Sequence, residues 1–370
     1  MTTSLREDIT VEEKALLAEV GYEEENERAG TCVLVDQAVR HIGLTDNAVE
    51  ILPLAEALRR YDWVQDLMFG LIDPDEDERI AEVAESRHAP VGHFVRVLEG
   101  AKVRLPIQLF TLLAAPQGRQ FHHNITVIEK GAEVEMISGS AVPRSVHAGH
   151  HVSLSESYLR EGAICRSVSI EHWAANMEVH SYARSRLEKN AHATDSVIQL
   201  APVKHHVSQS RSYLEEGATA NDQSVIYAPV GTTRIMDSET WLKGQGSRSE
   251  SITRMVTAGG VISNRSTLIG DASGTSGFLG CNGLKLTDEG EIFSVPALRA
   301  LNAQAQLSHE ASIGMIDQEK LSYLMASGMS EDEARDLIIQ GFLNLDEQKI
   351  PEAVREEVIR AIAAARSGAM

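Results

Sequence analysis

The stretch from Lys130 to Ala218 contains one turn-like pattern four times, as Lys130-Gly131-Ala132, Glu161-Gly162-Ala163, Lys189-Asn190-Ala191 and Glu216-Gly217-Ala218. The central residues follow one another at steps of 31, 28 and 27 residues. Gly and Asn are the residues that best tolerate the positive φ of a tight corner. A repeat of about 20 to 50 residues built from short strands indicates a solenoid or a propeller.

Segments that flank these turns alternate apolar and polar residues, as half-buried strands do. Examples are Asn124-Ile125-Thr126-Val127-Ile128 and Ser224-Val225-Ile226-Tyr227-Ala228. The Trp-Asp dipeptides of propeller blades are absent from the sequence. We therefore predict a mainly β fold whose core, residues 99–298, is a right-handed parallel β-helix (a β-solenoid).

The two ends of the chain have a different pattern and predict helical regions over residues 1–98 and 299–370, which would cap the solenoid. The acidic run Asp73–Glu78 lacks the Gly and the closing Glu of a calcium-binding EF-hand, so it predicts a solvated turn. Near the C-terminus, Ser330 and Glu333 have the spacing of a capping box. A last helix is expected over residues 351–366.

Composition excludes several classes of function. The 370 residues carry a formal net charge of −20, which argues against nucleic-acid binding because phosphate contacts require clustered Lys and Arg. Three widely spaced cysteines, Cys32, Cys165 and Cys281, form no disulfide framework. The sequence shows no signal peptide and no long apolar run, so we expect a cytoplasmic protein without a membrane span.

The pair His309-Glu310 is the first candidate for chemistry. Taken alone, it fits a surface His and Glu at the start of a helix. With its flanks Leu307-Ser308 and Ala311-Ser312-Ile313-Gly314, and with the helical run after it, the segment closely resembles the C-terminal signature of the SufB/SufD family. Those proteins are core subunits of the SUF iron–sulfur cluster assembly machine. Imidazole and carboxylate suit Fe(II), so the resemblance implies that His309 and Glu310 are metal and cluster ligands.

Cys281 is the best thiol candidate. The segment Gly277-Phe278-Leu279-Gly280-Cys281 resembles the family's Gly-His-x-x-Cys segment, and thiolate is the standard cluster ligand. Phe278 stands where many relatives have His. The alternative is a buried small apolar residue, which describes most free cysteines.

One departure from the family pattern concerns Asn264. The segment Ser266–Asp271 resembles a SufB strand in which a Cys stands two residues before the Ser, and that position is Asn264 here. Whether Cys281 replaces this cysteine is left open by the sequence. The resemblance covers residues 110–345 well and suggests the short SmsB-like branch of the family.

The histidine pairs offer an alternative metal site. His122-His123 and His205-His206 put successive side chains on opposite faces of a strand, so at most one of each pair faces a given site. A polysaccharide-acting β-helix enzyme is a further alternative, but Asp195, Asp222 and Asp237 form no adjacent pair in the sequence.

Taken together, the resemblance implies a non-catalytic scaffold that builds and transfers a transient iron–sulfur cluster of the 4Fe-4S type. A SufC-type ABC ATPase would dock on the C-terminal helices, because the chain itself has no Walker A motif. The chain would pair with itself or with a SufB/SufD paralogue and deliver clusters to apo-protein acceptors. The alternative is a SufD-like structural or iron-entry partner that binds no cluster.

Overall fold

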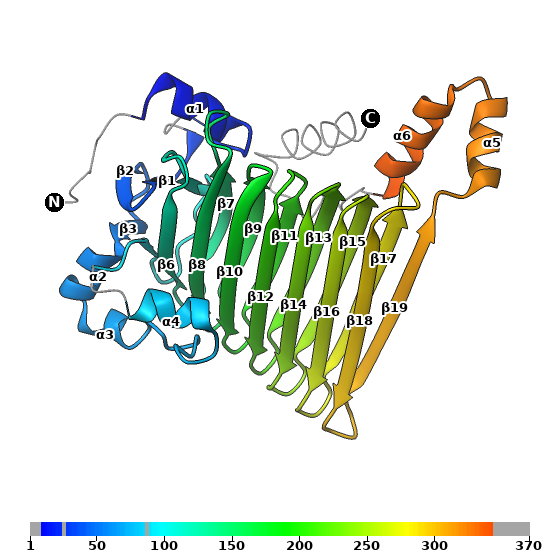
Figure 1. Cartoon of the computed structure of the whole chain (residues 1–370). Helices are drawn as coiled ribbons and strands as arrows, with labels where there is room; N and C mark the ends of the chain where they lie inside the picture. Colours follow the sequence, from blue (N-terminus) through cyan, green and yellow to red (C-terminus); the bar gives the residue numbers. More distant parts are fainter. Residues whose placement is uncertain (1–8, 24–26, 86–88, 343–370) are drawn as a thin grey trace.

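The computed structural model describes residues 9–23, 27–85 and 89–342. Its centre is a parallel β-solenoid in which two sheets face each other and successive strands alternate between them (Figure 1). The predicted β-solenoid is therefore confirmed.

The first sheet has the strand order β19-β17-β15-β13-β11-β9-β7-β5-β1-β2. Its strands are β1 (Gly30–Val35), β2 (Ala38–Leu44), β5 (Ile107–Leu112), β7 (Glu133–Ala141), β9 (Ile164–His172), β11 (His192–Gln199), β13 (Thr219–Pro229), β15 (Arg248–Ala258), β17 (Ser276–Lys285) and β19 (Gln306–Met315).

The second sheet has the order β18-β16-β14-β12-β10-β8-β6-β4-β3. Its strands are β3 (Val49–Pro53), β4 (His93–Val97), β6 (Arg119–Ile128), β8 (Ala148–Leu159), β10 (Asn176–Leu187), β12 (His205–Leu214), β14 (Thr233–Leu242), β16 (Val261–Gly270) and β18 (Glu291–Ala300). Pairing is parallel except between β1 and β2 and between β3 and β4.

The repeated tripeptides form the corners between the sheets. Gly131, Gly162 and Gly217 have φ of 66° and Asn190 has φ of 56°, so the predicted left-handed corners are confirmed. The backbone N–H at each corner donates to a carbonyl of the next corner, which links successive coils. The pattern continues at Gly246 and Gly274, with φ of 71° and 68°, where the tripeptide itself is not kept.

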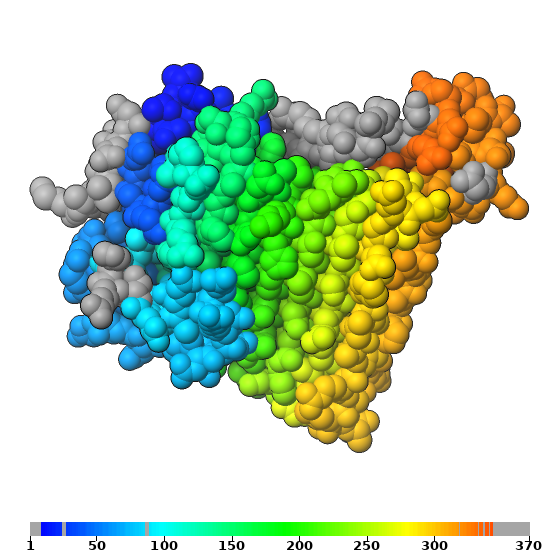
Figure 2. Space-filling model, in the orientation of Figure 1, coloured from blue at the N-terminus to red at the C-terminus, as the bar shows by residue number. Residues whose placement is uncertain are grey.

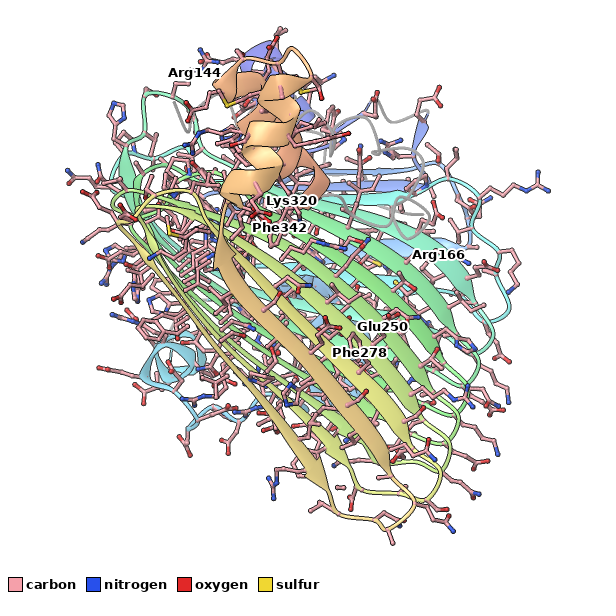
Figure 3. The ribbon with its side chains drawn as sticks, turned by 90° about the vertical axis from the view of Figure 1, so that its right-hand side faces the viewer. Arg144, Arg166, Glu250, Phe278, Lys320 and Phe342 are labelled. Atoms are coloured by element: carbon pink, nitrogen blue, oxygen red, sulfur yellow. The ribbon has the colours of Figure 1, made fainter. Side chains whose placement is uncertain are left out.

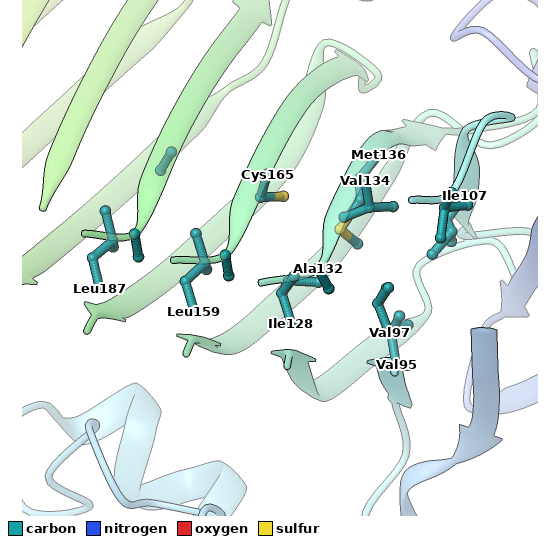
Figure 4. Close-up of a cluster of buried hydrophobic side chains, with 14 of the residues drawn as sticks. Val95, Val97, Ile107, Ile128, Ala132, Val134, Met136, Leu159, Cys165 and Leu187 are labelled. Atoms are coloured by element: carbon teal, nitrogen blue, oxygen red, sulfur yellow. The ribbon is translucent and has the colours of Figure 1, made fainter. Parts of the chain in front are cut away.

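The interior beside these corners is apolar. Stacked columns from successive coils fill it, with Ala132, Ala163, Ala191 and Ala218 in one column and Ile128, Leu159, Leu187, Leu214 and Leu242 in another. Figure 4 shows Ile128, Leu159 and Leu187 side by side, with Cys165 on the neighbouring sheet. Each coil buries this face only against its neighbours, so the first and last coils need covers of another kind.

The N-terminal end is covered by a mixed layer of helices and strands. Its helices are α1 (Val11–Ala18), α2 (Leu54–Arg60), α3 (Asp62–Gln65) and α4 (Glu78–Ala84). Helix α1 packs on β5 and β7, while α4 packs on β6 and β8. The prediction of a helical N-terminal region is therefore wrong in part, because β1 to β4 also lie there and extend both sheets.

The acidic turn before α4 is solvated as predicted, since Asp73, Asp75 and Glu78 are exposed, and two of its side chains also anchor it to the second sheet. Glu76 forms an ion pair of 2.9 Å with the buried Arg184 and a second ion pair with Arg211. Asp77 accepts hydrogen bonds from the Arg79 N–H and from the hydroxyl of Tyr182. Two of the negative charges, on Glu76 and Asp77, are thus paired with basic and hydroxyl groups of the second sheet.

At the C-terminal end, two helices project beyond the last coil as a hairpin, drawn in orange in Figure 2. They are α5 (Gln318–Ala326) and α6 (Glu331–Phe342). The capping box is confirmed, since the Glu333 N–H donates to Ser330 Oγ and the Ser330 N–H donates to Glu333 Oε2. The predicted helical region from residue 299 is wrong for residues 299–315. These residues hold the end of β18 and the whole of β19. The expected helix 351–366 lies outside the described residues.

Candidate functional site

The three predicted site residues lie on the last two strands of the first sheet. Strands β17 and β19 are parallel neighbours in which Leu279 pairs with His309, Gly280 with Glu310 and Cys281 with Ala311. Because side chains alternate along a strand, Cys281 and His309 share one face and Glu310 lies on the other. The buried Leu279 and Cys281 belong to inner clusters, so the shared face is the interior.

Cys281 is 1% exposed and packs among apolar side chains of both sheets, including Met255 and Ile262. This packing agrees with the alternative of a small buried apolar residue. One polar contact departs from it, since the Asn264 side-chain amide donates to Cys281 Sγ at 3.6 Å. Asn264 lies on β16 of the opposite sheet, so this contact crosses the interior.

His309 and Glu310 are exposed on the terminal strand. The prediction that places them at a helix start is wrong, because both lie in the middle of β19. Gly280, the neighbour of Glu310, has no side chain, and the ring of Phe278 lies so close that an added Cβ would be 3.2 Å from its Cε1. The Phe278 ring therefore occupies part of the outer face beside Gly280, the register partner of Glu310.

A shallow groove of about 660 Å³ lies on this same outer face. Its lining includes Asn221, Arg248, Glu250, Phe278 and Ser308, and Ser308 precedes Glu310 by two residues on the same side of β19. Figure 3 views the molecule from this end and labels Glu250 and Phe278 on neighbouring strands. Glu310 therefore lies on the same outer face as this groove, whereas Cys281 lies on the inner face.

A buried charged network inside the solenoid was missed by the sequence reasoning. Glu171 accepts hydrogen bonds from Trp173 Nε1 at 3.0 Å and Gln199 Nε2 at 3.2 Å. Arg234 Nη1 donates to His206 Nδ1 at 3.0 Å, and His206 lies 3.6 Å from Glu171. Burial raises the pKa of Glu171 and lowers the pKa of Arg234 to about 10. The available signal was strand parity, which puts Glu171 and Arg234 on inward positions.

The alternative metal site among histidines finds no support. His122 bonds to the Asp36 carbonyl, while its neighbour His123 bonds to the buried Glu156 at 2.8 Å, so the pair is split between faces as expected. Within residues 9–23, 27–85 and 89–342, no group of three or more His, Cys, Asp or Glu side chains could hold a metal ion.

The structure corrects one detail about the aspartates. Asp195 and Asp222 are direct register partners on β11 and β13, although they are far apart in the sequence. Ser167 donates to Asp195, and burial raises the pKa of the Asp195 carboxyl. The pair shares the parity of the interior-facing Ala193 and Ala220, so a polysaccharide chain on the outer surface does not meet it.

Comparison with known proteins shows the family of this chain. The sequence model described as "SUF system FeS cluster assembly, SufBD core domain" matches residues 111–342. The chain belongs to the SufBD family. The match begins within β5 and ends with α6, so it spans the solenoid and the helical hairpin.

Individual SufBD relatives cover nearly the whole chain. An "Iron-sulfur cluster assembly SufBD family protein" of Archaeoglobus fulgidus is 35% identical over 353 residues, which are 95% of this chain and 94% of that protein. One of the same name from Methanothermobacter thermautotrophicus is 30% identical, with 96% and 88% covered. The "Iron-sulfur cluster assembly protein SufB" of Bacillus subtilis is 24% identical, with 73% and 59% covered.

Proposed function

We propose that this SufBD protein is a scaffold subunit that holds a transient iron–sulfur cluster of the 4Fe-4S type and passes it to apo-protein acceptors. The observation that carries the proposal is the position of Cys281 and His309, which lie on the inner face of the last two strands of the first sheet. Thiolate and imidazole are both iron ligands. In this proposal the chain catalyses no reaction of its own, and it acts in the cytoplasm.

Two copies would complete the ligand set. Strands β18 and β19 end their sheets, and the last coil exposes Phe293, Val295, Leu301, Ile313 and Met315. Terminal strands with exposed apolar side chains are surfaces for pairing with another chain. We infer that a second copy, or a SufB/SufD paralogue, covers this coil and brings its own Cys281 and His309 to the inner face and its own Glu310 to the outer face.

The helical hairpin is the proposed contact for a SufC-type ABC ATPase. Helices α5 and α6 bury Leu321, Ala334 and Ile339 but expose Tyr323, Met325 and Leu337, and Met329 is exposed in the turn between them. Exposed aromatic and Met side chains are typical of protein interfaces. ATP would act by favouring one arrangement of the paired scaffolds over another, which requires different affinities for the two arrangements. None of the described helices is long and apolar enough to span a membrane.

The second candidate is a SufD-like structural or iron-entry partner that binds no cluster. The observation in its favour is that the described residues of one chain include no group of three metal-binding side chains. Cys281 is also buried among apolar residues, as a purely structural cysteine would be.

The deciding experiment counts iron and sulfide in the complex of the full chain with its ATPase after anaerobic reconstitution. The scaffold role predicts a stoichiometric cluster that is lost in Cys281→Ser and reduced in His309→Ala and Glu310→Ala. Cys165→Ser is the matched control, because Cys165 is also a buried inward thiol but lies on β9, in the middle of the first sheet. A folded complex without iron, or a cluster that persists in Cys281→Ser, would support the SufD-like role instead.

A further inference from the structure

We propose that the C-terminal segment, residues 343–370, lies along an apolar stripe on the outer face of the first sheet and ties the helical hairpin to the N-terminal layer. Cys165 and Ala193 belong to an inner cluster, so the side chains of opposite parity on β9 and β11 face outward. The stripe consists of such outward apolar side chains on five neighbouring strands: Val168, Ile170, Ile198, Val225, Tyr227, Val256 and Leu284. This surface is separate from the one proposed for cluster binding.

The middle of the stripe is buried although it faces outward. Ile198 is 1% exposed, and Val225 and Val256 are 0% exposed. These are exposures within a single chain, so the cover belongs to the same chain. In residues 9–23, 27–85 and 89–342, the helices of this cluster are α1, which packs on β5 and β7, and the α5–α6 hairpin at the opposite end of the solenoid (Figure 1). We therefore assign the cover over β11 to β15 to residues beyond those ranges.

The chain leaves α6 at one end of the stripe. Ile339 and Phe342, on the last turn of α6, pack in the same cluster as Leu284 of β17. Residues 343–370 are the longest stretch beyond the described ranges. The helix expected over residues 351–366 would be about 24 Å long at a rise of 1.5 Å per residue. The five strand steps from β17 to β7 also measure about 24 Å. The expected helix thus matches the distance from the hairpin to α1.

The sequence of this segment is amphipathic, as a helix on an apolar stripe needs to be. At 100° per residue, Val354, Val358 and Ile362 fall on one side of the expected helix. Glu356 and Arg360 fall on the opposite side. With the apolar side on the stripe, both apolar surfaces are removed from water while the charged side stays hydrated.

Such a tie would restrict the hairpin. Coupling between distant parts of a protein is carried by packed side chains and rigid elements. A helix seated across β9 to β15 would therefore pass a displacement of α5 and α6 on to the first sheet and to α1. If an ATPase docks on the hairpin, its movement reaches the sheet by this route. That consequence rests on the proposed function, whereas the seating of the segment does not.

The test measures how well the stripe is shielded, through a thiol placed beneath the segment. Ser196 lies on the outer face of β11, two residues before Ile198, and is 1% exposed. In the full chain that carries Ser196→Cys, we expect the introduced thiol to react slowly with iodoacetamide. Adding Val358→Asp and Ile362→Asp should raise the rate at least about tenfold, because carboxylates are not buried among apolar side chains. Mass spectrometry of the peptide that contains position 196 gives the rate.

Two controls accompany the measurement. Ala364→Asp adds the same charge on the other side of the expected helix and should leave the rate unchanged. Cys165, which is buried inside the solenoid, should stay unreactive in every variant that keeps the fold. If Cys165 also reacts in the double variant, the fold is lost, and Val358→Asp alone decides by the same criteria.

Faster alkylation at position 196, with Cys165 unreactive and Ala364→Asp unchanged, supports the proposal. An introduced thiol that reacts equally fast with and without the aspartates would overturn it. Shielding that appears only at high protein concentration would assign the cover to a second copy and would also overturn it. Failure of the scaffold role appears as iron that persists in Cys281→Ser, whereas failure of this inference appears only in the alkylation rates.

Discussion

At the scale of single residues, the interior of this solenoid holds several buried polar side chains. His122, His151 and His206 lie on inward positions and are at most 3% exposed. Their hydrogen-bond partners include a backbone carbonyl, a glutamine and an arginine. Such groups are tolerated inside because they are neutral or paired. Protonation would add a charge to these buried side chains, so the stability of the folded chain depends on pH.

Protonation of the buried histidines predicts a loss of stability in mild acid. Burial lowers the pKa of His93 to about 3 and that of His122 to about 4, against an ordinary value of 6.5. Below pH 6.5 these histidines therefore bind protons in the unfolded chain but stay neutral in the folded chain. The free energy of unfolding keeps its full value above pH 6.5. It falls as the pH drops toward 4, by about 1.4 kcal/mol per pH unit for each such histidine.

The measurement is urea unfolding of the full chain at several pH values between 7 and 5. In His122→Gln, the slope of the unfolding free energy against pH should be smaller by the equivalent of one proton. The same substitution at the exposed His147 controls for the loss of an imidazole. An unfolding free energy of the wild type that stays constant between pH 7 and pH 5 would contradict this prediction.

At the scale of elements, the corners set the length of each coil and hence the register of the strands. Corner residues at positive φ turn the chain from the second sheet into the first, and their N–H groups bond to the next corner. Lys130 pairs with Glu161 at 2.8 Å and Lys189 with Glu216 at 2.9 Å along the same edge. These exposed ion pairs each contribute little, so the backbone conformation of the corner is the larger effect.

Two glycine corners allow strain and collision to be measured separately. A Cβ at Gly162 would meet nothing within 4 Å, so Gly162→Ala should cost only the left-handed backbone strain, about 1 to 2 kcal/mol. A Cβ at Gly217 would lie 2.3 Å from Asn190 Oδ1, so Gly217→Ala should cost more. Gly314→Ala, in open space without a positive φ, is the control.

The unfolding free energies of the three variants, measured in urea, check this order. We expect the loss to be largest for Gly217→Ala, intermediate for Gly162→Ala and smallest for Gly314→Ala. A loss in Gly314→Ala as large as that in Gly162→Ala would show that the corner conformation is not what limits the substitution.

At the scale of the whole molecule, the two ends of the solenoid differ. The first coils are covered by α1 to α4 and by the antiparallel strands β2 and β3. At the other end, most of β19 is exposed, and the helical hairpin stands beside the coil in Figure 1. In the part of the chain that the structure describes, the last coil has no such cover, and an exposed sheet end favours association with another chain.

Association through the last coil makes a prediction about oligomeric state. The purified full chain should be a dimer, and Phe293→Glu combined with Val295→Glu should make it monomeric, because both side chains are more than half exposed on β18. Ile235→Glu places the same charge at an exposed apolar position on β14, away from the end, and should stay dimeric. Sedimentation velocity measures all three. A dimeric double variant or a monomeric wild type would refute the use of this surface by two copies.

The sequence by itself determined the solenoid, its corners and the alternation of faces, because these depend on local rules: the φ that a residue tolerates and the period of two along a strand. It also determined the family, through short segments such as Gly277–Cys281 and Leu307–Gly314. It did not determine where the sheet ends, and β19 was taken for helix, because a strand on an exposed terminal coil lacks the buried alternation that marks a strand.

Only the tertiary structure decided which distant residues meet. The contact between Asn264 and Cys281, the pairing of Asp195 with Asp222 and the separation of Glu310 from Cys281 all follow from the register between strands of successive coils or opposite sheets. Register depends on the number of residues in each corner, and this number differs from coil to coil. A slip of one residue moves every side chain to the other face, so local patterns could name the candidate residues but could not place them together.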